Sequence, residues 1–584
     1  MPLNKLKEIL KMDKVNKRIA ILGGGPSGLF MFKRLIESGR SDFEIEIFEK
    51  KSQLGAGMPY SNEGANKEHI TNVSGNEIPQ IVTTIHEWVC TADRKVLEPY
   101  SITPESFNDY KVLPRLLFGE YLSAQFDLLQ NMAKAAGILI KIHKGITVTD
   151  VIDKPELNQV WVEFEGAALV EFDEVIICTG HNWPKNNEGK IDGYFDSPYP
   201  PAKLALHCNH AVALKGSSLT AIDAIRTLAR SNGSFKSGAN GMLSYHINEE
   251  SPDFKIVMHS RNGLLPAVRF HLEDTHLQNK SILTPEEIKE HRAHNEGFLS
   301  LDFIFEKDFK NLFKENHADF YELIKDMQIE EFVETMMAKR ENTEPFTLLR
   351  EEYTEAERSI KTHESIYWKE ALAILSFAMN YPAKHLSAED MIRLQKTLMP
   401  LISVVIAFVP QTSCREMLAL YAAGRLTLKT VDKDSIAEPD DKGGATYKYK
   451  DENGNQHADY YKVFVDCVGQ PHLSYNDFPF KSMLESKIIS PALLQFRSAQ
   501  KGFHASKDSS KKVVEIKDDY YLEVPGITIN DNFQVVDGNN NPNPRIYIMA
   551  VPYIGGYNPD YSGLDFGEEA SCRIINSVLK PVSI

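Results

Sequence analysis

The chain has 584 residues, 42% hydrophobic and 25% charged, and this ordinary globular composition excludes a largely disordered protein. At about 150 residues per domain, the length allows two to four domains. The formal net charge of −16 repels phosphate backbones, so we expect no nucleic-acid partner. No apolar run is long enough to span a membrane, and the six cysteines form no C-x-x-C pair. We therefore expect a cytoplasmic protein without a metal site.

A glycine-rich turn follows the first predicted strand, RIAILG, and begins an apolar-periodic helix. The turn Gly23-Gly24-Gly25-Pro26-Ser27-Gly28 is a G-x-G-x-x-G pattern in the strand–turn–helix context that binds a dinucleotide. Its first glycine permits the tight turn, its second admits a pyrophosphate, and its third lets helix and strand pack. Glu49 ends the next predicted strand, where its carboxylate can accept from ribose hydroxyls, which favours FAD or NAD over NADP. Lys50 follows as a cofactor contact or a solvated charge.

A second, degenerate copy of this arrangement begins at residue 211. The strand AVALKG leads into Gly216-Ser217-Ser218-Leu219-Thr220-Ala221 and a helix, so serine replaces the second glycine. The next predicted strand ends at Arg261, whose guanidinium can bind a 2′-phosphate, and the second site is therefore predicted to prefer NADP. The alternative is a strand–turn–helix without a ligand. Both copies continue into a meander and a strand ending in Cys-x-Gly, at Cys178 and Cys467, which predicts two dinucleotide-binding domains.

Residues 271–400 differ from both copies. They contain one glycine, 26 acidic and 16 basic residues, and N-cap signals before acidic pairs at Thr284 and Ser387. We predict an α/β fold with two Rossmann-like domains, for FAD and NADP, and an inserted all-helical domain. The insertion either covers the flavin and completes the substrate pocket, or forms an acidic docking surface. The predicted boundaries are 1–17 for a weakly helical tail, 18–200 with 525–584 for the FAD domain, 201–270 with 401–524 for the NAD(P) domain, and 271–400 for the insertion.

Several longer motifs resemble a known group of proteins. The motifs are GGGPSG, GAGMPYS, HITNVSG, PRLLFGEYL, ICTGHNWP, GSSLTAID and SRNGLLP. Together they resemble the bacterial FAD/NAD(P)-binding oxidoreductases of the two-dinucleotide-domain flavoprotein superfamily, which are similar to class B monooxygenases. One branch of these enzymes N-hydroxylates amino acids, including aspartate to nitrosuccinate. The sequence departs from the Baeyer–Villiger pattern, because its interdomain linker GYFDSPYP has no histidine.

The resemblance implies further site residues. Met58, Tyr60 and Asn72 are expected beside the isoalloxazine, although core packing explains the first two equally well. His181 is a catalytic candidate or a structural histidine, and Arg115 either binds pyrophosphate or caps a helix. Arg269 and Arg415 flank the insertion and are candidate catalytic residues that grip a substrate carboxylate, with surface salt bridges as the alternative. The remaining cofactor-binding candidates are Thr147, Thr179, Gly180, Gly563 and Leu564.

The resemblance also implies the reaction. NADPH delivers hydride to FAD, and the reduced flavin meets molecular oxygen to form a C4a-hydroperoxide that oxygenates a small substrate, such as the amine nitrogen of an amino acid. Two alternatives stay open. One is a flavin dehydrogenase or reductase that passes electrons to another acceptor, and the other is a flavin-binding module without turnover. The lack of a C-x-x-C pair removes disulfide reductases from the first alternative.

Overall fold

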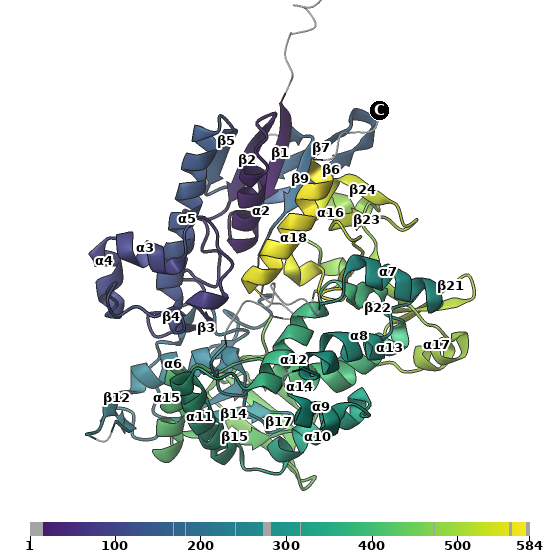
Figure 1. Ribbon diagram of the computed structural model, residues 1–584. Coiled ribbons are helices and arrows are strands. Elements are labelled where there is room, and N and C mark those ends of the chain that lie inside the picture. The colour runs from purple at the N-terminus through teal and green to yellow at the C-terminus, as the bar shows by residue number, and fades with distance from the viewer. Residues whose placement is uncertain are drawn as a thin grey trace, which may run out of the picture.

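The computed structural model describes residues 16–166, 169–180, 183–239, 241–272, 282–315, 317–470, 473–559 and 563–579. Most of the predicted N-terminal tail and His181 lie outside these ranges. Two mainly parallel sheets and a helical region form the body of the molecule (Figure 1). No helix within the described ranges is long and apolar enough to cross a membrane.

The first sheet is built from both ends of the chain. Its six strands lie in the order β23-β24-β9-β1-β2-β5, and all neighbours are parallel except β23 and β24. Helices α2 and α18 lie side by side against it (Figure 1), and α5 packs on α2. The bounds are β1 (Lys17–Leu22), α2 (Pro26–Glu37), β2 (Phe43–Glu49), α5 (Arg115–Ala135), β5 (Leu139–Lys144), β9 (Glu174–Ile177), β23 (Gln534–Val536), β24 (Pro542–Ile548) and α18 (Gly563–Val578).

The second sheet repeats this plan with five parallel strands in the order β10-β19-β11-β14-β15. Each of the two sheets is accompanied by a three-stranded antiparallel meander, as the sequence repeat predicted. The bounds are β10 (Tyr194–Phe195), β11 (Ala211–Lys215), α6 (Leu219–Asn232), β14 (Lys255–Ser260), α15 (Gln411–Ala422), β15 (Leu426–Thr430) and β19 (Val463–Asp466), with meanders β6 (Val148–Lys154), β7 (Gln159–Phe164), β8 (Val170–Phe172) and β16 (Ile436–Pro439), β17 (Ala445–Lys450), β18 (Gln456–Tyr461).

The region between β14 and α15 is helical, which completes the predicted fold class. Thr284 caps its first helix through a capping box, and the Ser387 hydroxyl accepts from the Asp390 N–H, so both predicted start signals are used. The bounds are α7 (Pro285–His294), α8 (Leu301–Asp308), α9 (Ala318–Ile324), α10 (Ile329–Glu341), α11 (Pro345–Thr362), α12 (Tyr367–Ala378), α13 (Ala388–Arg393) and α14 (Met399–Val405).

The structure differs from the predicted domain boundaries at two places. Strand β10 pairs with β19, so the end of the predicted FAD segment belongs to the second sheet. The chain after β19 returns to the first domain, because its apolar side chains are buried in the first core and Ser482 donates to Asp150. The elements of this return are α16 (Lys481–Glu485), β20 (Pro491–Gln495), α17 (Ala499–Ser506), β21 (Val513–Ile516) and β22 (Asp519–Ile527).

A buried carboxyl group ends helix α8. Asp308 is 0% exposed, and its Oδ1 atom accepts a hydrogen bond from the Leu283 N–H at 3.1 Å. Its Oδ2 atom is buried without a hydrogen-bond partner among the described residues. Burial raises the pKa of Asp308 to about 7. The folded protein therefore holds this side chain protonated in acid and has to bury a charge above neutrality.

We predict that Asp308→Asn stabilises the protein at high pH only. The unfolded chain releases this proton near pH 4 (about 3.9 for aspartate), whereas the fold retains it to about pH 7, so stability falls as pH rises between these values. An amide keeps the acceptor for Leu283 without the charge, and we expect a gain of roughly 2–4 kcal/mol at pH 8. Thermal unfolding at pH 4.5 and 8 measures it, with exposed Asp326→Asn as the control. An equal shift at both pH values would contradict the prediction.

Candidate functional site

The glycine turn after β1 is shaped by the neighbouring strand. Gly23 has a φ of +112°, and a Cβ atom there would lie 2.5 Å from the Cys178 carbonyl oxygen at the end of β9. A Cβ on Gly28 would run into the carbonyl oxygen of Gly23. Helix α2 then begins with Gly25 as its N-cap, Pro26 in its first turn and no side-chain cap, which leaves first-turn N–H groups for a ligand. This backbone forms the anion cradle that the motif predicted.

Glu49 lies at the end of β2, beside the turn. It is 7% exposed, and its two carboxylate oxygens accept from the Gly24 N–H at 2.8 Å and the Lys51 N–H at 3.0 Å. Each carboxylate oxygen has further acceptor capacity for a ribose hydroxyl. Lys50, by contrast, is exposed, as expected of a solvated charge.

The loop GAGMPYS packs directly against the turn. A Cβ on Gly25 would lie 3.2 Å from the Gly57 Cα, so the two backbones come together here. Helix α5 closes the other side, because Gly119 allows it to contact the Tyr60 backbone. The Tyr60 ring packs edge-on to Phe118 with centroids 4.8 Å apart, and burial raises the pKa of its hydroxyl. Met58 is partly buried in the same loop. Core packing therefore accounts for Tyr60, whether or not it also contacts a cofactor.

Five further candidates lie at or just beyond the ends of strands and helices in the first domain. Thr179 follows β9, and its Oγ1 atom is buried without a hydrogen-bond partner in the part of the chain that the structure describes. Gly180 has open space around it. Gly563 and Leu564 begin α18, which runs beside α2. Thr147 lies after β5 and donates no side-chain bond to the turn; its carbonyl accepts from the Glu165 N–H. An unsatisfied hydroxyl, open space and a glycine cradle fit a bound dinucleotide such as FAD.

The second turn has the same backbone geometry as the first. Gly216 has a φ of +111°, and a Cβ there would lie 2.9 Å from the Cys467 carbonyl oxygen at the end of β19. The Ser217 hydroxyl donates to the Leu264 carbonyl at 2.8 Å, so it supports the turn. Ser218 is the exposed N-cap of α6, with Thr220 half-buried behind it. The serine that replaces glycine thus leaves the cradle intact.

Arg261 lies at the end of β14, next to this second turn. Its side chain is exposed and makes no hydrogen bond or ion pair with any described residue. A free guanidinium at this strand end suits a 2′-phosphate, because its donors match phosphate oxygens in pairs. The position fits the predicted preference for NADP.

Arg115 is engaged by protein groups. Its guanidinium forms an ion pair with Asp223 of α6 at 2.6 Å and donates to the Ile70 carbonyl at 3.1 Å. Tyr199 donates its hydroxyl to the same Asp223 oxygen at 2.7 Å. Burial alone would raise the pKa of Asp223, but Arg115 and Tyr199 outweigh it and hold that pKa below its ordinary value. Arg115 therefore links the two nucleotide domains, Pro114 takes the N-cap position of α5 instead of it, and pyrophosphate contact stays a prediction.

Arg269 and Arg415 do not come together to form the predicted binding site for a substrate carboxylate. Arg269 is 3% exposed, and its guanidinium is taken up by Glu77, the Ser74 hydroxyl and the Asn72 carbonyl. Arg415 lies on α15 and donates to the Gly241 carbonyl at 2.7 Å on the surface. One arginine is buried at a domain junction and the other faces solvent, so they do not converge on a substrate.

Sequence reasoning missed most of the interdomain contact. Besides Asp223 and Tyr199, it contains His69, which is 0% exposed and bonds the Asp223 carbonyl at 3.1 Å, and Glu68, which accepts from Thr227 at 2.7 Å. Burial lowers the pKa of His69, so it is neutral at physiological pH. Asp223 and Arg115 are 108 residues apart in the chain, and local spacing gives no signal for such a pair.

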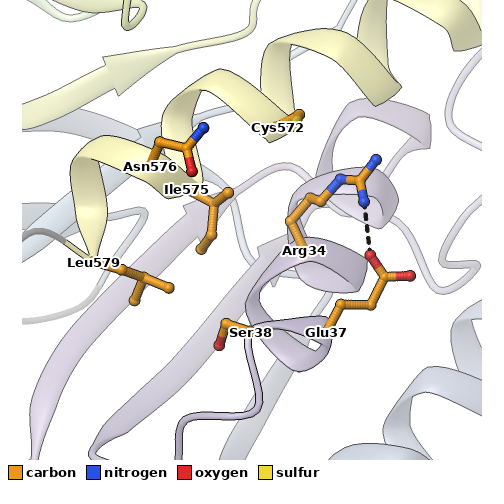
Figure 2. A pocket seen from close by; sticks show the side chains of 7 residues that line it. All are labelled: Arg34, Glu37, Ser38, Cys572, Ile575, Asn576 and Leu579. Atoms are coloured by element: carbon orange, nitrogen blue, oxygen red, sulfur yellow. Dashed lines mark hydrogen bonds and ion pairs between the residues drawn. The ribbon is translucent and has the colours of Figure 1, made fainter.

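One surface groove lies away from the glycine turns (Figure 2). It has a volume of about 450 Å³ and opens between the C-terminal turns of α2 and α18. Figure 2 shows Arg34 paired with Glu37 along its edge, at 2.8 Å. The glycine cradle lies at the opposite end of α2, so the groove is separate from the nucleotide site.

Two glycine turns of the same geometry, on two mainly parallel sheets, give the chain the layout of two dinucleotide-binding domains. Residues 20–182 match the profile of a family described as FAD-NAD(P)-binding, and residues 284–406 match that of the YdhS-like middle domain. The first match bears out the predicted FAD and NAD(P) cofactors and agrees with the predicted NAD(P)H-dependent flavoprotein oxidoreductase.

Similar proteins are found both among sequences and among solved structures. The chain is 27% identical over 576 residues to the uncharacterized protein YdhS of Escherichia coli (strain K12), covering 97% of this chain and 98% of that protein. It is 30% identical over 172 residues to flavin-containing monooxygenase 5 of Rattus norvegicus, covering 28% of each chain. Among solved structures, the ornithine N-hydroxylase of Kutzneria sp. 744 aligns with a TM-score of 0.48 and 12% identity, covering 96% of this chain and 98% of that one.

We predict that Gly25→Val abolishes FAD binding in a folded protein. The valine side chain would occupy the narrow space toward Gly57 that a pyrophosphate needs. Flavin released on denaturation, measured by absorbance, should fall at least about tenfold. Gly538→Val is the matched control, because its site is exposed and open. Full flavin content in Gly25→Val would place the cofactor elsewhere.

We predict that Arg261→Ala raises the KM for NADPH about 10- to 150-fold, and leaves that for NADH nearly unchanged, because only NADPH carries the 2′-phosphate. The steady-state rate of oxidation of NADPH and of NADH, measured over a range of concentrations, gives the two KM values. Arg350→Ala, an exposed arginine on α11, is the control. Equal losses with both nucleotides would make Arg261 a structural residue.

Proposed function

We propose that this chain is an NADPH-dependent FAD monooxygenase that oxygenates a small substrate, such as the amine nitrogen of an amino acid. The observation that carries the proposal is the pair of equivalent glycine cradles, one with Glu49 for a ribose and one with a free Arg261 for a 2′-phosphate. The relative flavin-containing monooxygenase 5, named as a monooxygenase, favours oxygenation over the alternatives.

The residues of the first domain would hold FAD. Backbone N–H groups at the start of α2 would bind its pyrophosphate, and Glu49 its ribose. When bound, FAD supplies the two-electron chemistry, accepting hydride from a nicotinamide and activating oxygen when reduced. His69, the first residue of the segment HITNVSG, is buried and neutral at the domain junction, and the ion-paired Arg115 donates to the carbonyl of Ile70 in the same segment.

The two nucleotides can react only if the domains are held in register. Asp223 lies in α6, whose N-terminus is the second cradle, and Arg115 begins α5, directly after β4 (Val112–Pro114). Strand β4 pairs with β3 (Ile70–Ser74), which carries HITNVSG. The Arg115–Asp223 ion pair therefore connects the second cradle to the segment expected at the flavin. It positions one nucleotide relative to the other without touching either reacting atom.

The proposal is tested with purified protein carrying FAD. Anaerobic mixing with NADPH should bleach the flavin, and aerobic turnover with candidate amino acids and diamines should yield hydroxylated product in proportion to NADPH consumed. Bleaching without any oxygenated product, but with turnover of another electron acceptor, would replace the monooxygenase by a reductase. A flavin that NADPH and NADH leave oxidised would leave only a binding module.

We predict that Arg115→Met combined with Asp223→Asn slows flavin reduction by NADPH about tenfold while FAD content stays normal. The double variant removes the interdomain link without leaving an unpaired buried charge. Stopped-flow absorbance measures the reduction rate. Arg226→Met combined with Glu416→Gln is the matched control, because this pair also involves α6 but lies within the second domain. An equal slowing in both double variants would assign the effect to α6 stability.

A further inference from the structure

The chain enters and leaves the helical region through two adjacent segments, residues 267–269 and residues 404–411. We call these two segments the neck. The two crossings are hydrogen-bonded to each other: the Ala267 N–H donates to Val404, and the Arg269 N–H donates to Val409 at 2.9 Å. The Val409 N–H returns a bond to Ala267 at 2.8 Å, and Gln411 donates its side-chain amide to the Arg269 carbonyl. The backbone of Arg269 is thus fixed inside the neck.

The side chain of Arg269 leaves the neck for the first domain. One nitrogen donates to the Asn72 carbonyl, and another donates to the Ser74 hydroxyl at 2.9 Å and to the Glu77 carboxylate. Glu77 is 8% exposed and also accepts from the Ser74 N–H at 2.9 Å. The buried Arg269–Glu77 pair is held in one arrangement, because the loss of any hydrogen-bond partner would leave a buried polar group unsatisfied.

The segment that Arg269 contacts is strand β3, which pairs with its neighbouring strand at few positions. Strand β3 pairs with β4 only at its ends, Ile70 with Pro114 and Ser74 with Val112, so two extra residues bulge out on β3. Bulges redirect side chains and leave backbone groups without ladder partners. Arg269 supplies the missing bond to the Asn72 carbonyl, and the Asn72 side chain is exposed.

We propose that Arg269 is a positioning residue that fixes Asn72 in the β3 bulge toward the flavin and couples the neck of the helical region to it. The inference rests on the proposed function for the location of the flavin. Its role is not substrate binding, since both terminal nitrogens of its guanidinium donate to protein acceptors.

The test is a double-mutant cycle on FAD binding. Arg269→Met combined with Glu77→Gln removes the contact without an uncompensated charge. We expect the FAD dissociation constant, from fluorescence titration, to rise roughly tenfold in the wild-type background and less than about twofold in an Asn72→Ala background. Hydrogen exchange of residues 69–77 should also speed up. The same fold-change in both backgrounds, or unchanged exchange, would overturn the proposal.

Arg545→Met combined with Asp153→Asn is the matched control, because this pair is also buried but lies at the far side of the first domain, at 2.9 Å. It should leave exchange of residues 69–77 and FAD affinity unchanged; an equal effect would indicate general destabilisation and reject the positioning role. Neither readout needs turnover. A protein that binds FAD but is not reduced by NADPH would therefore refute the proposed function and leave this test intact.

Discussion

A single steric constraint organises both nucleotide domains. At the end of each central strand, the carbonyl of a cysteine on the neighbouring strand occupies the space where a Cβ would lie, at Gly23 against Cys178 and at Gly216 against Cys467. Only glycine fits, and its positive φ turns the chain sharply into the following helix. That turn aims the helix N-terminus at the edge of the sheet. The helices, the outer strands and the nucleotide sites all take their places from it.

The same constraint explains why the sequence predicted this much of the fold. Glycine turns, strand periodicity and the Cys-x-Gly pairs are local signals, because each depends on residues that are close together in the chain. At the glycine turns, the backbone geometry also excludes every other residue type. The N-cap signals at Thr284 and Ser387 are local for the same reason. The return of residues after β19 to the first core was not predicted, because burial of short apolar segments does not say which core receives them.

The partners of the three arginines could not be predicted from neighbouring residues in the sequence. Arg115, Arg269 and Arg415 all lie in or near motifs at domain junctions, yet two form ion pairs with carboxylates of the chain and one bonds a backbone carbonyl at the surface. An arginine that holds a carboxylate of its own chain and one that holds a ligand have the same sequence signature. The partner alone decides between them, and Asp223 and Glu77 lie more than a hundred residues from the arginines they hold.

The construction of the first sheet from both chain ends constrains how the protein is made. Strand β9 lies between β1 and β24, and β24 begins at residue 542, so one edge of β9 stays unpaired until that late segment has been made. The second sheet is complete at residue 466. During synthesis the second sheet is therefore made before the first is complete, whereas β1 can pair with β2 and β9 early. The free edge of β9 is the part of the first sheet that has to be shielded until β24 arrives.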